Sequence, residues 1–426
     1  MPDIKAALRE YVEIVRGFST NARLVLLALS LIGISYGSFT TLFNLYIVEL
    51  GFDEAFLGIL IGISAAGAAI ASVPCGLLVD RIGARRGLLL GTVITAIGIL
   101  IEVTITIAWV LIVGAVIAAV GVALIFVAQA PFFAANSTER DRMHLYSVAA
   151  AIFVLAGIGG SLFAGFVPGW IREVFGDLSV AASYRATLLA TGAISGLSLF
   201  ALVRMRETGR PDWVRPSREV VRTTFHSPAV RRLILTGLFL SLGGGLIVPF
   251  FNVFYQEVHG ASTEIVGIAR AVGITVTVAG SLGAPWLGGK FGLVGAVVIA
   301  RLLSAPFLLL MGLSPFLVAA VAFFSIRTFM VYMSDPLHTD FSMRIVPPEI
   351  RATANSLTFM SWNVTLGIGG WVGGVLIAGY GYTLPFVLGS VITLVAAGVY
   401  WAAFREYQHD RYTPQRTEPV TSPAQD

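Results

Sequence analysis

The sequence predicts an all-α membrane protein whose twelve transmembrane helices form two pseudo-symmetric six-helix bundles. Of its 426 residues, 56% are hydrophobic and only 12% are charged, whereas a soluble domain carries about 25% charged residues. Several long stretches contain no Asp, Glu, Lys or Arg, and the second half of the chain repeats features of the first. A surface of this composition belongs in a bilayer rather than in water.

Helix positions follow from the lengths of the apolar stretches. A spanning helix needs about 20 mostly apolar residues. The uncharged stretch 352–404 is too long for one crossing at about 1.5 Å per residue, so a turn is expected at the glycines and tyrosines of 379–382. Twelve helices are expected near residues 22–48, 55–79, 87–107, 110–135, 145–168, 185–203, 231–256, 264–288, 292–312, 316–339, 352–379 and 384–404.

The distribution of basic residues predicts the orientation of these helices. With this assignment, 23 Lys and Arg residues fall on one side of the membrane, together with both termini, and two Arg residues fall on the other. Cytoplasmic loops are enriched in Lys and Arg, so both termini are expected in the cytoplasm and the chain in the cytoplasmic (inner) membrane. Three polar segments complete the organisation: an interfacial helix at 1–21, a linker at 204–230 and a tail at 405–426.

An internal repeat divides the chain into two bundles, at 22–203 and 231–404. Asn44 matches Asn252 at an offset of 208, residues 80–83 match 289–292 at 209, and residues 155–165 match 365–375 at 210. An offset this constant over well-separated matches indicates two homologous halves. Two parallel halves related by an axis along the membrane normal are a known transporter architecture, with the binding site between them.

The loop between the second and third helices carries a specific motif, Gly76-Leu-Leu-Val-Asp-Arg-Ile-Gly-Ala-Arg-Arg86. It resembles the signature loop of the major facilitator superfamily, G-x-x-x-D-R-x-G-x-R-R, and with the helix count it implies that fold and alternating access. The resemblance also implies that Asp80 clamps the two halves together when the cytoplasmic side is closed; a simple topology anchor is the alternative. The gating residues expected on this basis are Gly76, Asp80, Arg81, Gly83, Arg85, Arg86, Glu139, Arg140 and Arg142.

The fifth helix carries small residues at a spacing of four, namely Gly157, Ser161 and Gly165. Such a face lets helices approach closely and slide, although ordinary tight packing explains it equally well. Many proton-coupled drug antiporters of the family resembled here carry G-x-x-x-G-P-x-x-G-G on this helix. The chain has Leu155-Ala156 in place of Gly-Pro, which weighs against the drug-antiporter interpretation.

Ionisable residues inside the membrane are candidates for function, because burying a charge in hydrocarbon is costly. Arg327 is expected near the midplane of the tenth helix, one of those that line the cavity in the family, and is the first candidate for a substrate contact; an ion pair with Asp335 is the alternative. Arg270 is expected nearer the outer side, and Arg301 and Glu102 are expected either to form structural pairs or to extend toward the membrane interface.

Polar stripes on the cavity-lining helices supply the remaining candidates, with hydrogen bonding between neighbouring helices as the alternative for each. On the first helix, Tyr36, Thr40 and Asn44 share one face because they are four residues apart. The full set of expected substrate contacts is Tyr36, Thr40, Asn44, Gln129, Asn252, Arg270, Arg327, Trp362 and Asn363.

The expected function is secondary active transport of a small organic solute, anionic or zwitterionic, driven by an ion or proton gradient. Efflux of hydrophobic drug-like compounds and uncoupled facilitated transport are the alternatives. No catalytic set and no nucleotide-binding motif is present in the sequence, so an enzyme and an ATP-driven pump are not expected. We expect no cofactor and no metal; the expected partners are the solute and membrane lipids, with no nucleic acid, and the chain is expected to act as a monomer.

Overall fold

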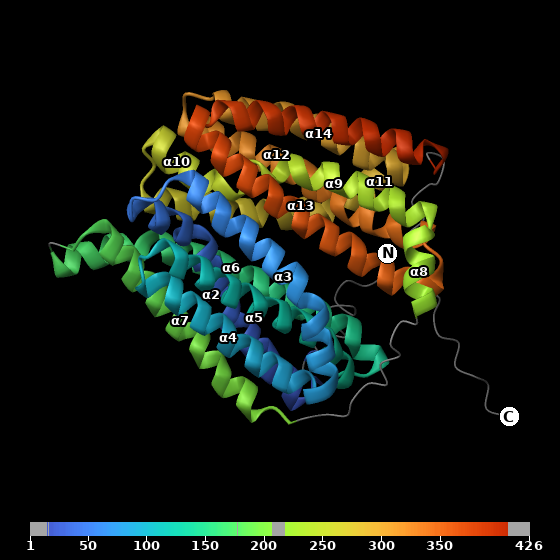
Figure 1. The fold of residues 1–426 in the computed structure, drawn as a ribbon, viewed down its shortest axis with the longest axis horizontal. Helices are drawn as coiled ribbons and strands as arrows, with labels where there is room; N and C mark the ends of the chain where they lie inside the picture. Colours follow the sequence, from blue (N-terminus) through green and yellow to red (C-terminus); the bar gives the residue numbers. More distant parts are fainter. Residues whose placement is uncertain (1–14, 16, 177, 207–217, 408–426) are drawn as a thin grey trace, which may run out of the picture.

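The structure is a computed structural model that describes residues 15, 17–176, 178–206 and 218–407 (Figure 1). The described residues are almost entirely helical and contain no strand. Within them, eleven helical stretches are long and apolar enough to cross a membrane. One of these, α11, has 51 residues and contains a non-helical residue at Gly292, so it supplies two crossings. The predicted all-α membrane fold with twelve crossings is confirmed.

The first six-helix bundle contains α2 to α7. Short polar residues begin several of these helices: Ser19, Asp53 and Ser179 each accept a hydrogen bond from a backbone N–H in the first turn. Thr138 forms a capping box with Asp141 at the start of the fifth crossing. The helices are α2 (Thr20–Glu49), α3 (Glu54–Ile82), α4 (Ala84–Thr104), α5 (Ala108–Ala135), α6 (Glu139–Phe175) and α7 (Val180–Arg204).

The second bundle follows a short helix, α8, which lies within the predicted 204–230 linker. Its elements are α8 (Arg218–His226), α9 (Pro228–Gly245), η1 (Val248–Phe250), α10 (Phe251–His259), α11 (Thr263–Leu313), α12 (Leu317–Ile345), η2 (Pro348–Ile350), α13 (Arg351–Tyr380), α14 (Thr383–Phe404) and η3 (Arg405–Tyr407). The predicted turn after α13 is present, with Gly381 at positive φ. Most of the predicted interfacial helix and tail lie outside the described residues.

The structure corrects two predicted helices. The seventh, expected to be continuous over 231–256, is divided into α9, η1 and α10. The division falls where three glycines at 243–245 weaken the helix and Pro249 cannot donate a backbone hydrogen bond. The fifth, expected over 145–168, runs from Glu139 to Phe175, since its capping box lies further upstream and Pro168 is accommodated within it.

The internal repeat is visible in the backbone at two glycines. Gly83 has φ 90° and separates α3 from α4, and Gly292 has φ 71° and divides α11. They are 209 residues apart, the same offset as the sequence match around them. A side chain is disfavoured at positive φ, so glycine serves the same turn in both halves.

The two bundles meet at one end of the molecule and diverge at the other (Figure 1). The closed end carries the turns at 50–53, 260–262 and 381–382; the open end carries the Gly83 turn. A hydrophobic cluster shared by the two bundles fills the closed end, with Tyr46 and Phe254 among its members. Toward the open end each bundle has a separate cluster of its own. The two bundles therefore share a hydrophobic core only at the closed end.

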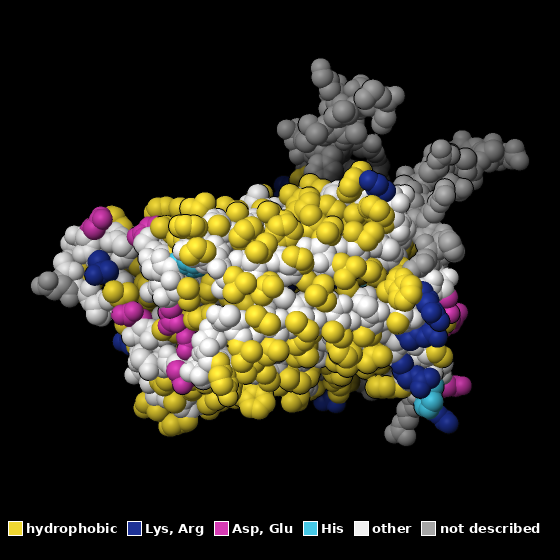
Figure 2. All heavy atoms as spheres, turned by 90° about the horizontal axis from the view of Figure 1, so that it is seen from above, with side chains coloured by type: hydrophobic (Ala, Val, Ile, Leu, Met, Phe, Trp, Pro, Cys, Tyr) yellow, Lys and Arg dark blue, Asp and Glu magenta, His cyan; other side chains and the backbone are white. Residues whose placement is uncertain are grey.

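Charged side chains also distinguish the two ends. In Figure 2 the acidic side chains gather toward the closed end and the Lys and Arg side chains toward the opposite end, with a largely hydrophobic surface between them. A surface of this kind suits a protein surrounded by lipid chains, with its ends in the two aqueous phases.

Candidate functional site

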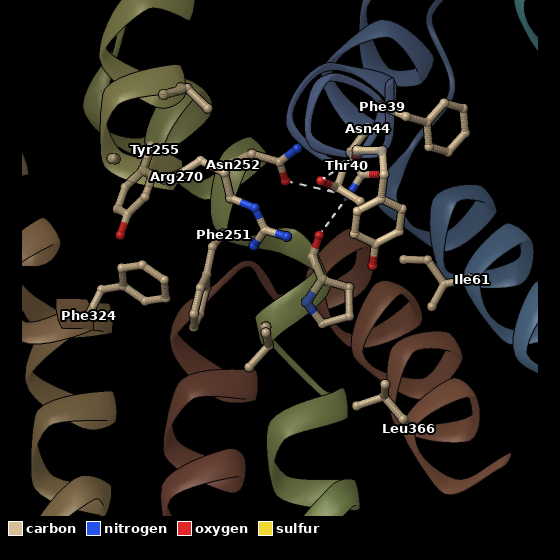
Figure 3. A pocket seen from close by; sticks show the side chains of 15 residues that line it. Phe39, Thr40, Asn44, Ile61, Phe251, Asn252, Tyr255, Arg270, Phe324 and Leu366 are labelled. Carbon is tan, nitrogen blue, oxygen red and sulfur yellow. Dashed lines mark hydrogen bonds between the residues drawn. The ribbon is translucent and has the colours of Figure 1, made fainter. Parts of the chain in front are cut away.

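A cavity of about 330 Å³ lies between the two bundles, next to the closed end. Its volume is at the lower end of the range for small-molecule sites, which is about 300–1,000 Å³. Helices of both bundles line it, as Figure 3 shows. The lining residues are Tyr36, Phe39, Thr40, Asn44, Ile61, Val248, Pro249, Phe251, Asn252, Tyr255, Val266, Ala269, Arg270, Phe324 and Leu366.

Arg270 brings a positive charge to this cavity from α11. Its guanidinium points from the α11 wall into the space between Asn252 and Phe251 (Figure 3). The Nε atom is buried without a hydrogen-bond partner, and no acidic side chain of the described residues forms an ion pair with Arg270. The side chain as a whole is half-buried, and an anionic group of a ligand would supply an acceptor for its guanidinium.

Tyr255 is a second polar group without a partner in the cavity wall. Its side chain is only 3% exposed, and its hydroxyl forms no hydrogen bond within the structure. Buried hydroxyls in proteins are normally hydrogen-bonded, so an unsatisfied one beside a cavity indicates a place for a ligand or water. Arg270 therefore gives the cavity one cation, and Tyr255 contributes to its wall a side chain whose buried hydroxyl the protein leaves without a partner.

Aromatic side chains form the apolar part of the wall. Phe251 packs edge-to-face on Phe324, with ring centroids 4.8 Å apart, and Phe39 lines the cavity from α2. Tyr36 is exposed and packs against Phe153 of α6. The cavity thus combines an apolar lining with few polar groups, which is typical of sites for small organic molecules.

Asn44 and Asn252 join the two bundles at the closed side of the cavity. The Asn44 amide donates to the carbonyl of Pro249 at 2.6 Å and lies 3.4 Å from Asn252 Oδ1, as the dashed lines of Figure 3 indicate. The Asn252 amide donates to the carbonyl of Thr41 at 2.9 Å. Because Thr41 and Pro249 are also 208 residues apart, the two hydrogen bonds are equivalent under the internal repeat. This pair, the asparagine clasp, bonds each half to a backbone carbonyl of the other.

The structure brings together five of the nine predicted contacts around the cavity: Tyr36, Thr40, Asn44, Asn252 and Arg270. The other four are not in its lining. Gln129 is half-buried on α5, Asn363 donates to the Phe359 carbonyl of its own helix, and Trp362 packs against the hydrophobic cluster of the second bundle.

Arg327 is not among the residues that line this cavity. It is buried at 9% exposure and faces α9, where its Nη2 atom would be 3.7 Å from a Cβ at Gly244. Asp335, considered as its partner, instead pairs with Arg301 of α11 at 2.6 Å. The structural pairing expected for Arg301 is therefore present. Glu102 is also buried, at 3% exposure, and one of its carboxyl oxygens has no hydrogen-bond partner.

The predicted gating loop lies at the open end. Asp80 is exposed there and forms no hydrogen bond or ion pair with the described second bundle. Arg85 donates to the carbonyls of Leu202 and Val203, at 3.4 and 2.7 Å, and so caps the end of α7. The side chains of Glu139 and Arg140 lie outside the described part of the structure. The clamp stays a prediction.

Sequence reasoning did not identify Tyr255 or the aromatic wall. Tyr255 lies three residues after Asn252, which places it on the same face of α10, so the helical spacing was an available signal. Phe324 precedes Arg327 by three residues on α12, yet only Phe324 reaches the cavity. Among the described residues, no group of three or more His, Cys, Asp or Glu is placed to hold a metal ion.

Comparisons with known proteins agree on a single family. The sequence profile of the Major Facilitator Superfamily matches residues 25–364. The multidrug resistance protein MdtG of Dickeya zeae (strain Ech586) is 24% identical over 385 residues, which are 85% of this chain and 89% of MdtG.

Solved transporter structures share the fold. A bacterial homolog of the human lysosomal transporter Spinster, in an inward-facing and unoccupied conformation, matches with a TM-score of 0.76 and 19% identity over 92% of this chain and 98% of its own. The nucleoside transporter NupG matches with a TM-score of 0.75 and 15% identity over 91% of this chain and 99% of its own. A D-xylose–proton symporter matches with a TM-score of 0.67 and 15% identity over 89% of this chain and 97% of its own.

Proposed function

The chain belongs to the Major Facilitator Superfamily, and from this premise we propose that it is a secondary transporter of a small organic solute with an anionic group. The solute is expected to bind in the cavity between the bundles and to cross the membrane as the bundles rock about it. The orientation expected from the basic residues would put the open end in the cytoplasm, and the conformation described above would then be inward-facing.

The observation that carries this proposal is the unpaired guanidinium of Arg270. Its charge-assisted hydrogen bonds to a carboxylate or phosphate would replace the partner that the protein does not supply. The rings of Tyr255, Phe251 and Phe324 would pack on the apolar body of the same solute. This assigns the anion contact to Arg270 rather than to Arg327, whose role as a substrate contact stays a prediction.

Two experiments test this assignment in sequence. A panel of carboxylates, phosphates, zwitterions and lipophilic cations is first screened by thermal shift, because a ligand that binds the folded state raises its melting temperature. The hits are then assayed for ATP-free uptake into proteoliposomes with and without a pH gradient. Uptake of anionic hits that the pH gradient accelerates supports a coupled transporter, and uptake indifferent to the gradient supports a facilitator.

Substitutions at Arg270 then define its contribution. Arg270→Gln should weaken binding of an anionic hit about 10- to 100-fold, since a hydrogen bond to a charged group contributes about 1.5–3 kcal/mol. Arg270→Lys should restore only part of it, because an ammonium does not bind a carboxylate bidentately. Arg172→Gln removes an exposed arginine outside the cavity and serves as the matched control. Equal losses in all three variants would contradict the proposal.

Efflux of hydrophobic compounds is the second candidate function. The name of the relative MdtG and the aromatic lining of the cavity favour it, whereas the altered helix-5 motif at Leu155-Ala156 weighs against it. This function predicts that lipophilic cations stabilise the protein and that Arg270→Gln leaves their binding unchanged or strengthens it. The thermal-shift panel therefore separates the two functions before any transport assay.

A further inference from the structure

Three side chains meet at the seam between the bundles on the closed end, outside the cavity. Glu54 is the first residue of α3 in the first bundle, Glu257 lies on α10, and Tyr382 precedes α14. The Tyr382 hydroxyl lies 3.1 Å from Glu54 Oε1 and 2.9 Å from Glu257 Oε2. A single phenol oxygen therefore lies at hydrogen-bonding distance from two carboxyl groups, one from each bundle.

The number of protons in this group is set by its contacts. Burial and the neighbouring carboxyl groups raise the pKa of the Tyr382 phenol, so it keeps its single proton and donates to one oxygen at a time. Ionised carboxylates only accept hydrogen bonds, so with both glutamates ionised the phenol can satisfy only one of its two contacts at a time. A second proton on either glutamate lets that carboxyl group donate to the phenol oxygen, and both contacts are then hydrogen bonds.

We propose that Glu54, Glu257 and Tyr382 form a proton-binding latch, which holds the closed end together when the two glutamates share one proton. The latch joins an element of the first bundle to two elements of the second, so it must break when the closed end opens. Glu257 is exposed, so the proton comes from the aqueous phase at that end. The latch rests on the rocking motion of the proposed function but not on the identity of the solute.

Other ionisable groups surround the latch on the elements packed against it. Glu49 ends α2, Asp53 caps α3, Tyr380 ends α13, and His259 ends α10. His259 is the one among these that titrates near neutral pH in an ordinary environment, and its Nε2 atom is buried without a hydrogen bond. No basic side chain of the described residues forms an ion pair with either latch glutamate.

The direction of the pH effect follows from linkage. When the closed end opens, the glutamates separate into water, where a glutamate has a pKa of about 4.3 and is ionised at neutral pH. The closed state then binds one proton more than the open state, so acid favours closure and alkali favours opening. One extra proton changes the ratio of closed to open molecules by up to tenfold per pH unit. This dependence begins above about pH 4.3 and continues as long as the closed pair keeps its proton.

Spin labels across the closed end measure this ratio without any solute. Cys75 is the sole cysteine, so a Cys75→Ala background carrying Phe175→Cys and Phe316→Cys places one label on each bundle at exposed positions of the closed end. The distance distribution of the full chain in lipid nanodiscs is recorded between pH 5 and pH 9. The short-distance population should fall as pH rises, with a slope close to one proton in the range where the closed pair keeps its proton.

Substitutions test whether the latch residues cause this pH dependence of the closed population. Glu54→Gln and Glu257→Gln each supply a permanent donor in place of the shared proton, so the closed population should become independent of pH in both. Asp53→Asn removes a neighbouring charge but keeps the helix cap, and His259→Gln removes the neighbouring imidazole; both should retain the slope. A slope that survives in Glu54→Gln, or that disappears in His259→Gln, overturns the proposal, whereas a failed substrate assignment at Arg270 leaves these results unaffected.

Discussion

The contact between Gly165 of α6 and Gly267 of α11 is one of the places where the two bundles approach each other through backbone. A Cβ added at Gly267 would lie 2.7 Å from Gly165 Cα and 2.8 Å from the Ser161 carbonyl oxygen. Carbon atoms in contact are normally about 3.5–4.0 Å apart, so Gly267→Ala forces the helices to separate by about 1 Å. Overpacking of this kind costs about 1–3 kcal/mol, and only the closed state experiences it.

The expected result is a shift of the conformational equilibrium away from the closed state. An energy of about 1–3 kcal/mol corresponds to a change of about 5- to 150-fold in the ratio of closed to open molecules. The Phe175→Cys and Phe316→Cys label pair measures this ratio directly. Gly192→Ala on α7 is the matched control, because its added Cβ meets no heavy atom within 4 Å. An unchanged distance distribution in Gly267→Ala, or an equal shift in Gly192→Ala, would refute the reasoning.

Three further predictions concern the clasp, the gating loop and the buried ion pair. Asn44→Ala and Asn252→Ala should each destabilise the closed state relative to the open state by about 1 kcal/mol. Because the two amides also contact each other, their effects should be non-additive in a double-mutant cycle. Additive effects would show that they act separately. Asp80→Asn should reduce transport without lowering expression, and unchanged transport kinetics would leave this loop as a topology signal. Arg301→Met should lower the melting temperature because it leaves Asp335 without its partner, and adding Asp335→Leu should recover part of the loss; no recovery would show that the ion pair is not the cause.

Much of the fold could be predicted from the sequence because it depends on local signals. The lengths of apolar stretches, the alternation of basic loops and the constant repeat offset give the number and order of the helices. The positive φ of Gly83 and Gly292 shows why the repeat keeps glycine at both positions. The break in the seventh helix was missed because hydropathy alone does not detect it, although three glycines and Pro249 mark it.

The site was only partly predictable because helix rotation and three-dimensional pairing are not local. Tyr36, Thr40 and Asn44 lie on one face of α2 because they are four residues apart, and that face lines the cavity. Depth in the membrane made Arg327 the first candidate, but depth does not say which way a side chain points. Which of the in-membrane arginines pairs with Asp335 was likewise set by packing between α11 and α12.

The central claim is that Arg270 provides the cavity with its preference for an anion. Isothermal titration of the wild type and of Arg270→Gln, each with a carboxylate from the thermal-shift panel and with its neutral carboxamide analogue, tests this most directly. The wild type should bind the carboxylate at least about tenfold more tightly than the carboxamide, and Arg270→Gln should bind the two with similar affinity. A preference for the carboxylate that survives in Arg270→Gln would contradict the claim.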